Sequence, residues 1–146
     1  PVKKFPSGVQ KLYLKEYGQA GAVLTEKNLK QLLWKIRWRK VMEAYLWWNP
    51  DEEGDCFNIE VNPDWISFQY VVNDGMEDGC FYSSFDPAYL DSDEESDTDT
   101  IYGCFMPLRY TMHDARLAAK CVEYFAHTGK LYPGTAWLKT LTGGEE

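Results

Sequence analysis

The segment from residue 56 to residue 72 constrains the fold more than any other part of the chain. Cys56–Val61 alternates apolar and polar side chains, Trp65–Val72 does the same, and Asn62-Pro63-Asp64 lies between them. A period of two residues is typical of a strand with one covered face, and an Asn-Pro-Asp sequence turns the chain. The pattern therefore predicts two antiparallel strands in a sheet whose two faces have different surroundings.

Further strands are expected on both sides of this pair. Each is a short apolar or aromatic run bounded by turn-forming residues, and Asn73-Asp74-Gly75 is a hairpin signal before one of them. The additional strands are expected at Val9–Tyr17, Ala44–Trp48, Gly79–Phe85 and Ile101–Met106. Trp47 and Trp48 are neighbours on one strand, so their side chains should point to opposite faces and one of them should meet a helix.

Two helices are expected, one near each end of the chain. Thr25 is a suitable N-cap for the first, which carries an apolar stripe at helical spacing from Leu29 to Ile36. The second is expected to begin at the N-cap Thr111, to include His113 in its first turn, and to stop at Gly129. The sum is one α+β domain spanning residues 1–146. It would consist of an antiparallel meander of about five or six strands packed with two helices.

Size and composition indicate a folded domain, and the N-terminus and the cysteines indicate a location inside the cell. The chain has 146 residues, of which 45% are hydrophobic and 16% aromatic, enough for a core of its own. No apolar run approaches the ~20 residues of a membrane span. The N-terminus lacks an apolar signal segment, so a cytoplasmic location is expected. The four cysteines form no CxxC pair and are expected to be reduced, buried small side chains: Cys56, Cys80, Cys104 and Cys121.

The net charge of −8 is unevenly distributed along the chain. Residues 1–42 carry ten Lys and Arg against two Glu, whereas residues 43–110 carry one Arg against seventeen Asp and Glu. The middle of the chain should therefore present an acidic surface. Such a surface repels nucleic acid and membranes and attracts a basic partner.

The densest charge lies in Asp91–Asp99, where six of nine side chains are carboxylates. Like charges at this density predict a solvated loop without regular structure. Aromatic side chains beside carboxylates are typical of protein-binding hot spots. The candidate partner-binding residues are therefore Asp91, Asp93, Glu94, Glu95, Asp97 and Asp99 of the acidic run, Glu52 and Glu53 of another acidic turn, and the aromatic residues Trp47, Tyr82 and Tyr89.

No recognisable catalytic or metal-binding motif accompanies this surface. The chain has no P-loop, no nucleophile elbow and no HExxH motif, and the acidic run lacks the glycine and terminal Glu of a calcium loop. If both histidines lie on the second helix, His113 and His127 are about 21 Å apart and share no function. A binding protein is thus expected instead of an enzyme, without cofactor or metal and with no site for nucleic acid or membrane.

The C-terminal third resembles a known family. Ala118-Ala119, Tyr124-Phe125-Ala126, Gly129-Lys130-Leu131-Tyr132-Pro133 and Trp137 resemble the end of the bacterial immunity proteins, in particular immunity family one, which neutralise polymorphic toxins. The resemblance extends by pattern alone over about residues 25–140, and the acidic run and the double Trp have no counterpart in it. It implies that this chain binds a cognate toxin domain, such as a deaminase or a nuclease, and occludes its substrate cleft.

Two other function classes remain open at this point. A phage or plasmid protein that mimics DNA and inhibits a host DNA-binding protein would have the same electrostatics without the C-terminal signature. A small enzyme with an unfamiliar acidic site would need carboxylates clustered in a concave, partly buried pocket. The free protein is expected to be a monomer or a weak homodimer, since an exposed sheet edge can pair two copies.

Overall fold

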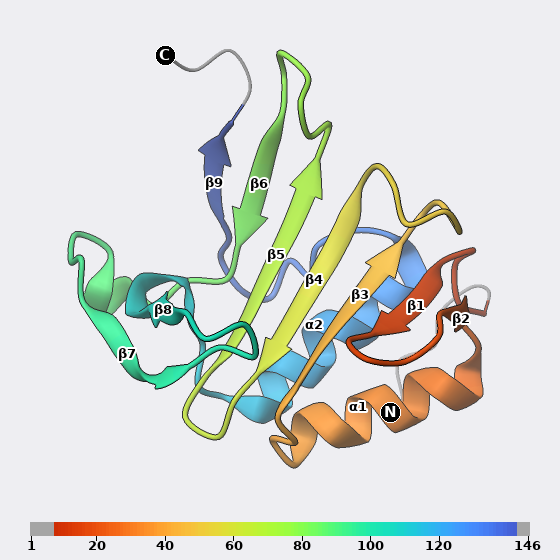
Figure 1. The fold of residues 1–146 in the computed structure, drawn as a ribbon, viewed down its shortest axis with the longest axis horizontal. Coiled ribbons are helices and arrows are strands. Elements are labelled where there is room, and N and C mark those ends of the chain that lie inside the picture. Colours follow the sequence, from red (N-terminus) through yellow and green to blue (C-terminus); the bar gives the residue numbers. More distant parts are fainter. Residues whose placement is uncertain (1–7, 143–146) are drawn as a thin grey trace.

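The computed structural model describes residues 8–142, and two helices cover one face of a seven-stranded antiparallel sheet (Figure 1). The strand order is β2-β1-β3-β4-β5-β6-β9, and β7 and β8 pair separately. The elements of the main sheet are β1 (Tyr13–Glu16), β2 (Ala22–Val23), β3 (Met42–Trp47), β4 (Cys56–Val61), β5 (Ile66–Val72), β6 (Cys80–Ser83) and β9 (Leu138–Leu141). The helices are α1 (Glu26–Arg37) and α2 (Ala115–Thr128), the second pair is β7 (Glu95–Asp99) and β8 (Phe105–Pro107), and two short 3-10 turns are η1 (Pro87–Tyr89) and η2 (Leu108–Tyr110).

The α+β fold class predicted from the sequence is confirmed. The segment Cys56–Val61 is a strand with the predicted bounds. It pairs with β5 along its whole length, from Cys56 opposite Val71 to Val61 opposite Ile66. The sheet has more strands than expected because the two-residue β2 and the C-terminal β9 add one strand at each edge. The predicted first strand is shorter than Val9–Tyr17, since only Tyr13–Glu16 pairs with β3.

The core lies between the sheet and the two helices. Alternation places Phe57 and Ile59 of β4 on the helix side, and both are fully buried. The ring of Phe57 stacks on Phe125 of α2 with 4.4 Å between centroids. On α1 the predicted apolar stripe is confirmed, with Leu29, Leu32 and Ile36 buried and Leu33 packed at the margin. The family-like C-terminal segment belongs to this core, because Trp137 packs on both Phe57 and Phe68.

The start of α2 differs from the sequence prediction. Its N-cap is Asp114, whose carboxylate accepts hydrogen bonds from the backbone N–H groups of Arg116 and Leu117. Thr111 is not the cap, because its hydroxyl donates to the carbonyl of Leu108 and the chain forms η2 first. His113 consequently precedes the helix instead of lying in its first turn. The predicted stop at Gly129 is confirmed.

Two further sequence expectations need correction. Trp48 lies beyond the end of β3, although it does meet a helix as expected, with its ring 6.1 Å from that of Phe125. Of the four cysteines, which are free, Cys104 is exposed and not a buried filler, because it lies in the turn between β7 and β8. The strand expected at Ile101–Met106 begins only at Phe105 for the same reason.

Candidate functional site

The acidic run is part of a β-hairpin, and the prediction of a structureless loop is wrong for Glu95–Asp99. We call residues 91–107 the acidic hairpin; it contains the acidic run, β7, the turn and β8. Along β7, Ser96 is buried and Thr98 half-buried, whereas Glu95, Asp97 and Asp99 are exposed. Strand alternation thus turns the hydroxyl side chains toward the protein and the carboxylates toward solvent, where their repulsion is screened.

The acidic hairpin is fastened to the main sheet by side-chain hydrogen bonds near the end of β7 and at its tip. The hydroxyl of Thr98 donates to the carboxylate of Asp64, in the turn between β4 and β5, over 2.7 Å. At the tip, the hydroxyls of Tyr102 and Tyr45 are hydrogen-bonded at 2.7 Å. The ring of Tyr102 also packs edge-on against Tyr17, with centroids 5.3 Å apart. These contacts hold the carboxylates of the hairpin at a fixed place on the molecule.

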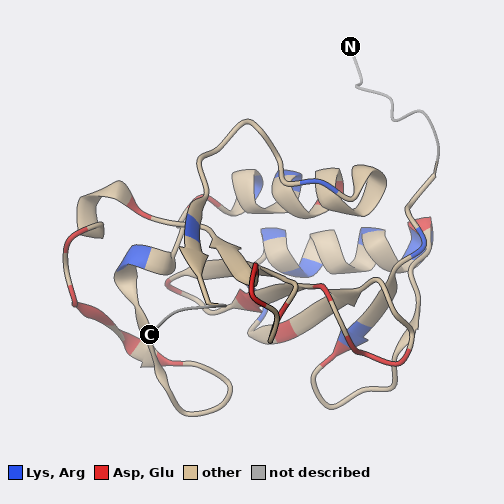
Figure 2. Ribbon diagram, turned by 90° about the horizontal axis from the view of Figure 1, so that it is seen from above, with Lys and Arg blue, Asp and Glu red and all other residues tan. Residues whose placement is uncertain are grey.

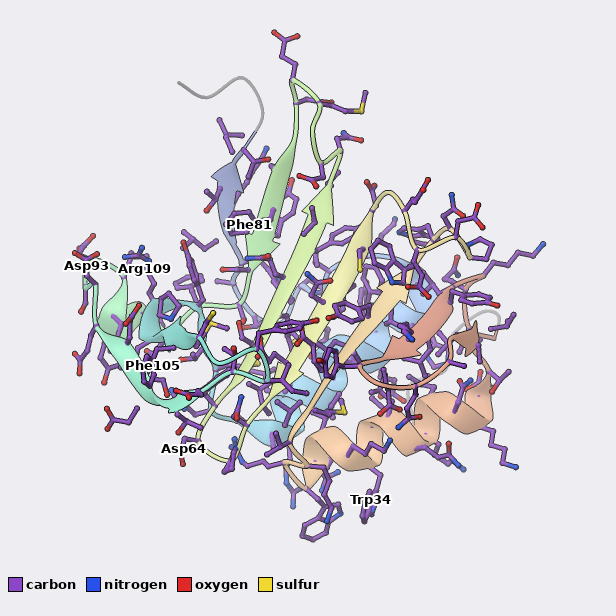
Figure 3. The ribbon with its side chains drawn as sticks, viewed as in Figure 1. Trp34, Asp64, Phe81, Asp93, Phe105 and Arg109 are labelled. Atoms are coloured by element: carbon purple, nitrogen blue, oxygen red, sulfur yellow. The ribbon has the colours of Figure 1, made fainter. Side chains whose placement is uncertain are left out.

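One arginine contacts the start of the acidic hairpin, at the end away from its tip. The guanidinium of Arg109 donates to the carbonyl of Ser92 over 2.9 Å and lies 3.3 Å from a carboxylate oxygen of Asp93. Figure 3 shows Asp93 and Arg109 next to each other at this end, with Asp64 near the opposite end of β7. Asp93 itself is fully exposed, so the ion pair contributes little stability and leaves its charge available.

The structure brings together one part of the predicted partner-binding set. Six of its residues lie on the acidic hairpin and all six are exposed: Asp91, Asp93, Glu94, Glu95, Asp97 and Asp99. Tyr89 adjoins them in η1, where its carbonyl accepts from the backbone N–H of Ser92.

The other predicted residues lie elsewhere. Glu52 and Glu53 are exposed in the loop between β3 and β4, across the sheet from the hairpin (Figure 1). Trp47 is half-buried at the end of β3, beside that loop. Tyr82 is half-buried on β6, and the ammonium of Lys139 lies 5.7 Å from its ring centroid. These four residues therefore share no surface with the acidic run.

Two other aromatic side chains lie on the hairpin itself, beside its carboxylates. Tyr102, in the turn that follows β7, is 56% exposed, and Phe105, at the start of β8, is 49% exposed. Phe105 is absent from the predicted partner-binding set, because the sequence places it only within an expected strand, Ile101–Met106. The one sequence signal for its exposure is its position close to the acidic run. A strand that pairs with such a charged segment cannot be buried on both faces.

Charge is separated across the molecule. Seen from above, most of the described Lys and Arg lie on the helices or directly after them, and most Asp and Glu lie on the hairpin and on the loops of the other side (Figure 2). The helix side also carries exposed tryptophans, Trp34 at 54% and Trp38 at 65% exposure, on and just after α1. The molecule thus presents a basic, aromatic side and an acidic, aromatic side.

A second group of carboxylates lies on the sheet face that the helices leave uncovered. Glu43 of β3 and Glu60 of β4 are opposite each other in the strand register. Glu43 is only 8% exposed, and its Oε1 atom has no hydrogen-bond partner. One carboxylate oxygen of Glu60 accepts from the backbone N–H of Ile101, in the hairpin tip, at 3.4 Å. Sequence alternation predicts that both residues share a face but gives no sign that a hairpin covers them.

The environment of this pair disfavours two negative charges. Burial raises the pKa of Glu43, and hydrogen bonding with Tyr45 only partly offsets it. Burial and the nearby charge of Glu43 together raise the pKa of Glu60 from 4.5 to about 7, against the opposing effect of the Ile101 N–H. Near neutral pH the two carboxylates therefore hold a proton part of the time.

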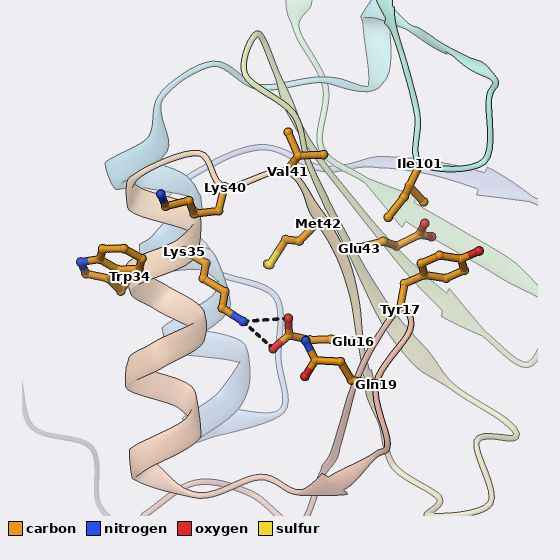
Figure 4. A pocket seen from close by; sticks show the side chains of 10 residues that line it. All are labelled: Glu16, Tyr17, Gln19, Trp34, Lys35, Lys40, Val41, Met42, Glu43 and Ile101. Carbon is orange, nitrogen blue, oxygen red and sulfur yellow. Dashed lines mark hydrogen bonds and ion pairs between the residues drawn. The ribbon is translucent and has the colours of Figure 1, made fainter.

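Two hollows adjoin the pair. A cleft of about 370 Å³ lies between α1 and the end of the sheet, and it contains the ion pair of Lys35 and Glu16 at 2.9 Å. Figure 4 shows Glu43 beneath Ile101 on the side of this cleft that faces away from α1. A smaller cavity of about 170 Å³ lies between the sheet and the base of the hairpin, and both Glu43 and Glu60 line it.

Comparisons with known proteins add no family to these observations. Family models, curated proteins and solved structures each give no match for this chain. Within residues 8–142, no three His, Cys, Asp or Glu side chains are grouped so that they could hold a metal ion. In the same part of the chain, no helix is long and apolar enough to cross a membrane.

Proposed function

We propose that this chain is an immunity-type protein that binds and neutralises a cognate bacterial toxin domain through its acidic hairpin. The observation that carries the proposal is that side-chain hydrogen bonds hold this hairpin in place on the sheet. Six exposed carboxylates and two exposed aromatic rings project from one element that is hydrogen-bonded to the sheet at Asp64 and Tyr45. A charged element held in place loses little entropy on binding, so more of its interaction energy appears as affinity.

The charge distribution supports a basic partner surface. Carboxylates on alternate residues of β7 are roughly 7 Å apart along the strand. They face solvent together and would meet the Lys and Arg side chains with which a toxin holds nucleic acid phosphates. Complementary charge raises the association rate above the usual 10⁵–10⁶ M⁻¹s⁻¹, roughly, of uncharged partners. An antidote benefits from this rate because it must bind before damage accumulates.

The exposed aromatic residues supply the other half of a tight interface. Tyr and Phe beside charged residues are typical of hot spots, where buried rings slow dissociation while the charges around them set the approach. Tyr102 and Phe105 stand at the turn of the hairpin, so a partner that meets the carboxylates of β7 also reaches these rings.

The resemblance to the immunity proteins, which rests on short sequence motifs alone, is the other ground for the proposal. Its residues are distributed over α2, the turn at Gly129 and Trp137, and the fold joins them into one packed unit against β4 and β5. The acidic hairpin lies outside this unit. A shared scaffold with a variable binding element is the arrangement expected where each antidote recognises its own toxin. The proposal accordingly describes a cytoplasmic binding protein without catalytic activity.

The test is capture followed by neutralisation. The tagged chain is used as bait in extracts of its native host, and the captured protein is identified by mass spectrometry. Its domain is then expressed alone and together with the chain. We expect growth arrest by the domain alone and rescue on co-expression. A captured host DNA-binding protein that releases DNA when the chain is added would establish the DNA-mimic alternative instead.

A matched variant links the rescue to the hairpin. Asp93→Asn, Glu94→Gln, Glu95→Gln and Asp97→Asn together remove four exposed charges without removing the side chains. We expect this variant to fold and to rescue growth less well at equal expression. A variant of the other acidic turn, Glu52→Gln with Glu53→Gln, should rescue like the wild type.

A further inference from the structure

The smaller cavity is a partly open hollow between the sheet and the base of the hairpin. Its volume is about 170 Å³, and among its walls are the side chains of Glu43, Asn58, Glu60, Gln69, Met106 and Tyr110. An apolar cavity of about 150 Å³ accommodates a benzene molecule, so this one has room for a group of similar size. Its walls combine two carboxylates and two side-chain amides with a ring and a thioether.

The cavity has negative charge without a matching positive charge. Glu43 is more than nine-tenths buried, and its Oε1 atom lacks any hydrogen-bond partner. Within residues 8–142, neither Glu43 nor Glu60 forms an ion pair with a Lys or Arg. A buried carboxylate is costly unless it is protonated or paired. A cation placed beside Glu43 and Glu60 would therefore be stabilised by their carboxylates.

The cations of the protein nearby are already engaged. In the adjoining cleft, Lys35 is bonded to Glu16, and the ammonium of Lys40 lies 5.4 Å from the ring centroid of Trp34. On β1, the ammonium of Lys15 donates to the carbonyl of Gln19. The guanidinium of Arg109 covers the ring of Tyr110 at 5.2 Å and is bonded to Ser92. The cation that fits the cavity must come from outside.

We propose that this cavity receives a guanidinium group carried by an arginine of the protein partner. The inference rests on the proposed function, since it names what the partner inserts beneath the acidic hairpin. A guanidinium is flat, is smaller than benzene, and presents a fork of N–H donors that carboxylate and amide oxygens can accept. Glu43 and Glu60 bring the carboxylates, and Gln69 and Asn58 bring side-chain amides, although Oδ1 of Asn58 also accepts from the thiol of Cys56 over 3.0 Å.

The site separates two roles of acidic side chains in binding. The exposed carboxylates of the hairpin act at a distance and set the association rate, whereas a buried pair acts only after contact and sets the dissociation rate. Binding of the cation would also displace the proton that the pair holds near neutral pH. The other titratable side chains that face the pair are tyrosines: Tyr45 from β3, Tyr102 from the hairpin tip, Tyr110 from η2 and Tyr17 after β1.

The first test uses the free chain and methylguanidinium as the probe. The amide of Ile101, which donates to Glu60, is followed by ¹⁵N NMR at pH 8 during a titration, with sodium chloride at equal ionic strength as the control. We expect a saturable shift with methylguanidinium only. Glu43→Gln should weaken the fitted affinity at least tenfold, and so should Glu60→Gln. Glu53→Gln, on the distant loop, should leave it unchanged.

Two results would overturn the cation site. One is a shift that does not saturate or that sodium chloride reproduces. The other is an affinity that both glutamine variants retain. Each variant replaces a carboxylate by an amide of the same shape, so its NMR spectrum also shows directly whether the fold is kept. Because this titration uses the chain alone, its failure leaves the proposed function standing.

The second test uses the captured partner domain and distinguishes a side chain from a free small cation. We expect Glu43→Gln to increase the dissociation rate at least tenfold without changing the salt dependence of association. Saturating methylguanidinium should weaken the complex with the wild type and not the complex with Glu43→Gln. A complex whose dissociation rate is unaffected by the variant would contradict insertion of a partner arginine.

Discussion

Gly129 ends α2 in a left-handed conformation, with φ of 73°, and its N–H donates to the carbonyl of Phe125 over 2.7 Å. A Cβ atom at this position would lie 2.6 Å from Cη2 of Trp48. The residue therefore meets two requirements at once, a positive φ and close approach of an aromatic ring. This explains in physical terms why a glycine stands inside the family-like segment.

Substituting this glycine should be costly. Gly129→Ala is expected to lose roughly 2–4 kcal/mol, the sum of left-handed strain and overpacking against Trp48. Gly75→Ala is the matched control, because Gly75 has φ of 82° and no neighbouring atom within 4 Å of the added Cβ. It should lose only about 1–2 kcal/mol. Urea unfolding of both variants measures the difference, and equal losses would refute the role of the Trp48 contact.

Glu60 should make stability depend on pH. The pKa of its carboxyl is about 7 in the folded protein against 4.5 ordinarily, so the folded state binds the proton more tightly than the unfolded chain. Stability from this group is fully present below pH 4.5 and is lost as the pH rises through 7. We expect a loss of about 1–2 kcal/mol over this range, reduced from the full linkage value by solvent screening.

The variant Glu60→Gln isolates this contribution. Free energies of unfolding measured in urea between pH 5 and pH 8 should decline less steeply for the variant than for the wild type. The exposed Glu53→Gln should follow the wild type throughout. If wild type and Glu60→Gln changed in parallel, the carboxyl would not be the titrating group.

At the scale of elements, the start of α2 can be tested directly. Asp114→Ala removes an acceptor that serves two backbone N–H groups, and it should destabilise the protein by about 1 kcal/mol. Asp91→Ala, at an exposed carboxylate outside any helix, should change the stability by less than about 0.5 kcal/mol. Thermal or urea unfolding decides the matter, and equal effects of both substitutions would argue against Asp114 as the cap.

The fastening of the acidic hairpin gives another prediction at this scale. Thr98→Ala removes the hydrogen bond to Asp64 and should cost about 1 kcal/mol in the local opening of the hairpin. Amide hydrogen exchange in β7 and β8 should then become about fivefold faster, while the amides of β4 and β5 keep their rates. Unchanged exchange in β7 would mean that the Thr98 bond does not hold the hairpin.

Local sequence signals predicted the elements whose partners are close along the chain. β4, β5 and α1 follow from alternation, a turn and a cap within about twenty residues. β9 was missed because Leu138–Leu141 is stabilised by pairing with β6, far away in the sequence. β7 was missed because its carboxylates mask Ser96 and Thr98, whose inward positions become visible only when β8 is paired with it.

The candidate site was predicted in part for a similar reason. The exposure of the acidic run follows from its charge alone, whatever the backbone does. Covering Glu43 and Glu60 requires that the hairpin tip, some forty residues beyond Glu60, fold back over β3 and β4. No local pattern contains that information, and the exposure of Phe105 depends on the same fold.

At the scale of the whole molecule, the uneven charge of the sequence becomes a spatial separation. The basic N-terminal third supplies α1 on one side of the sheet, and the acidic middle third supplies the hairpin and the loops of the other side. A molecule of this kind turns its acidic side toward a basic partner before contact. In the proposed function the fold would therefore orient the encounter, and the exposed rings and the buried pair would act after it.

The most direct test of this account is the association rate of the captured toxin domain with the chain, measured by stopped flow from low to high salt. For the wild type we predict a fast rate that falls steeply with salt. The variant with Asp93, Glu94, Glu95 and Asp97 neutralised should associate at least tenfold more slowly at low salt, with a flatter salt dependence and an unchanged fold. A variant that associates as fast as the wild type would contradict the central role of the acidic hairpin.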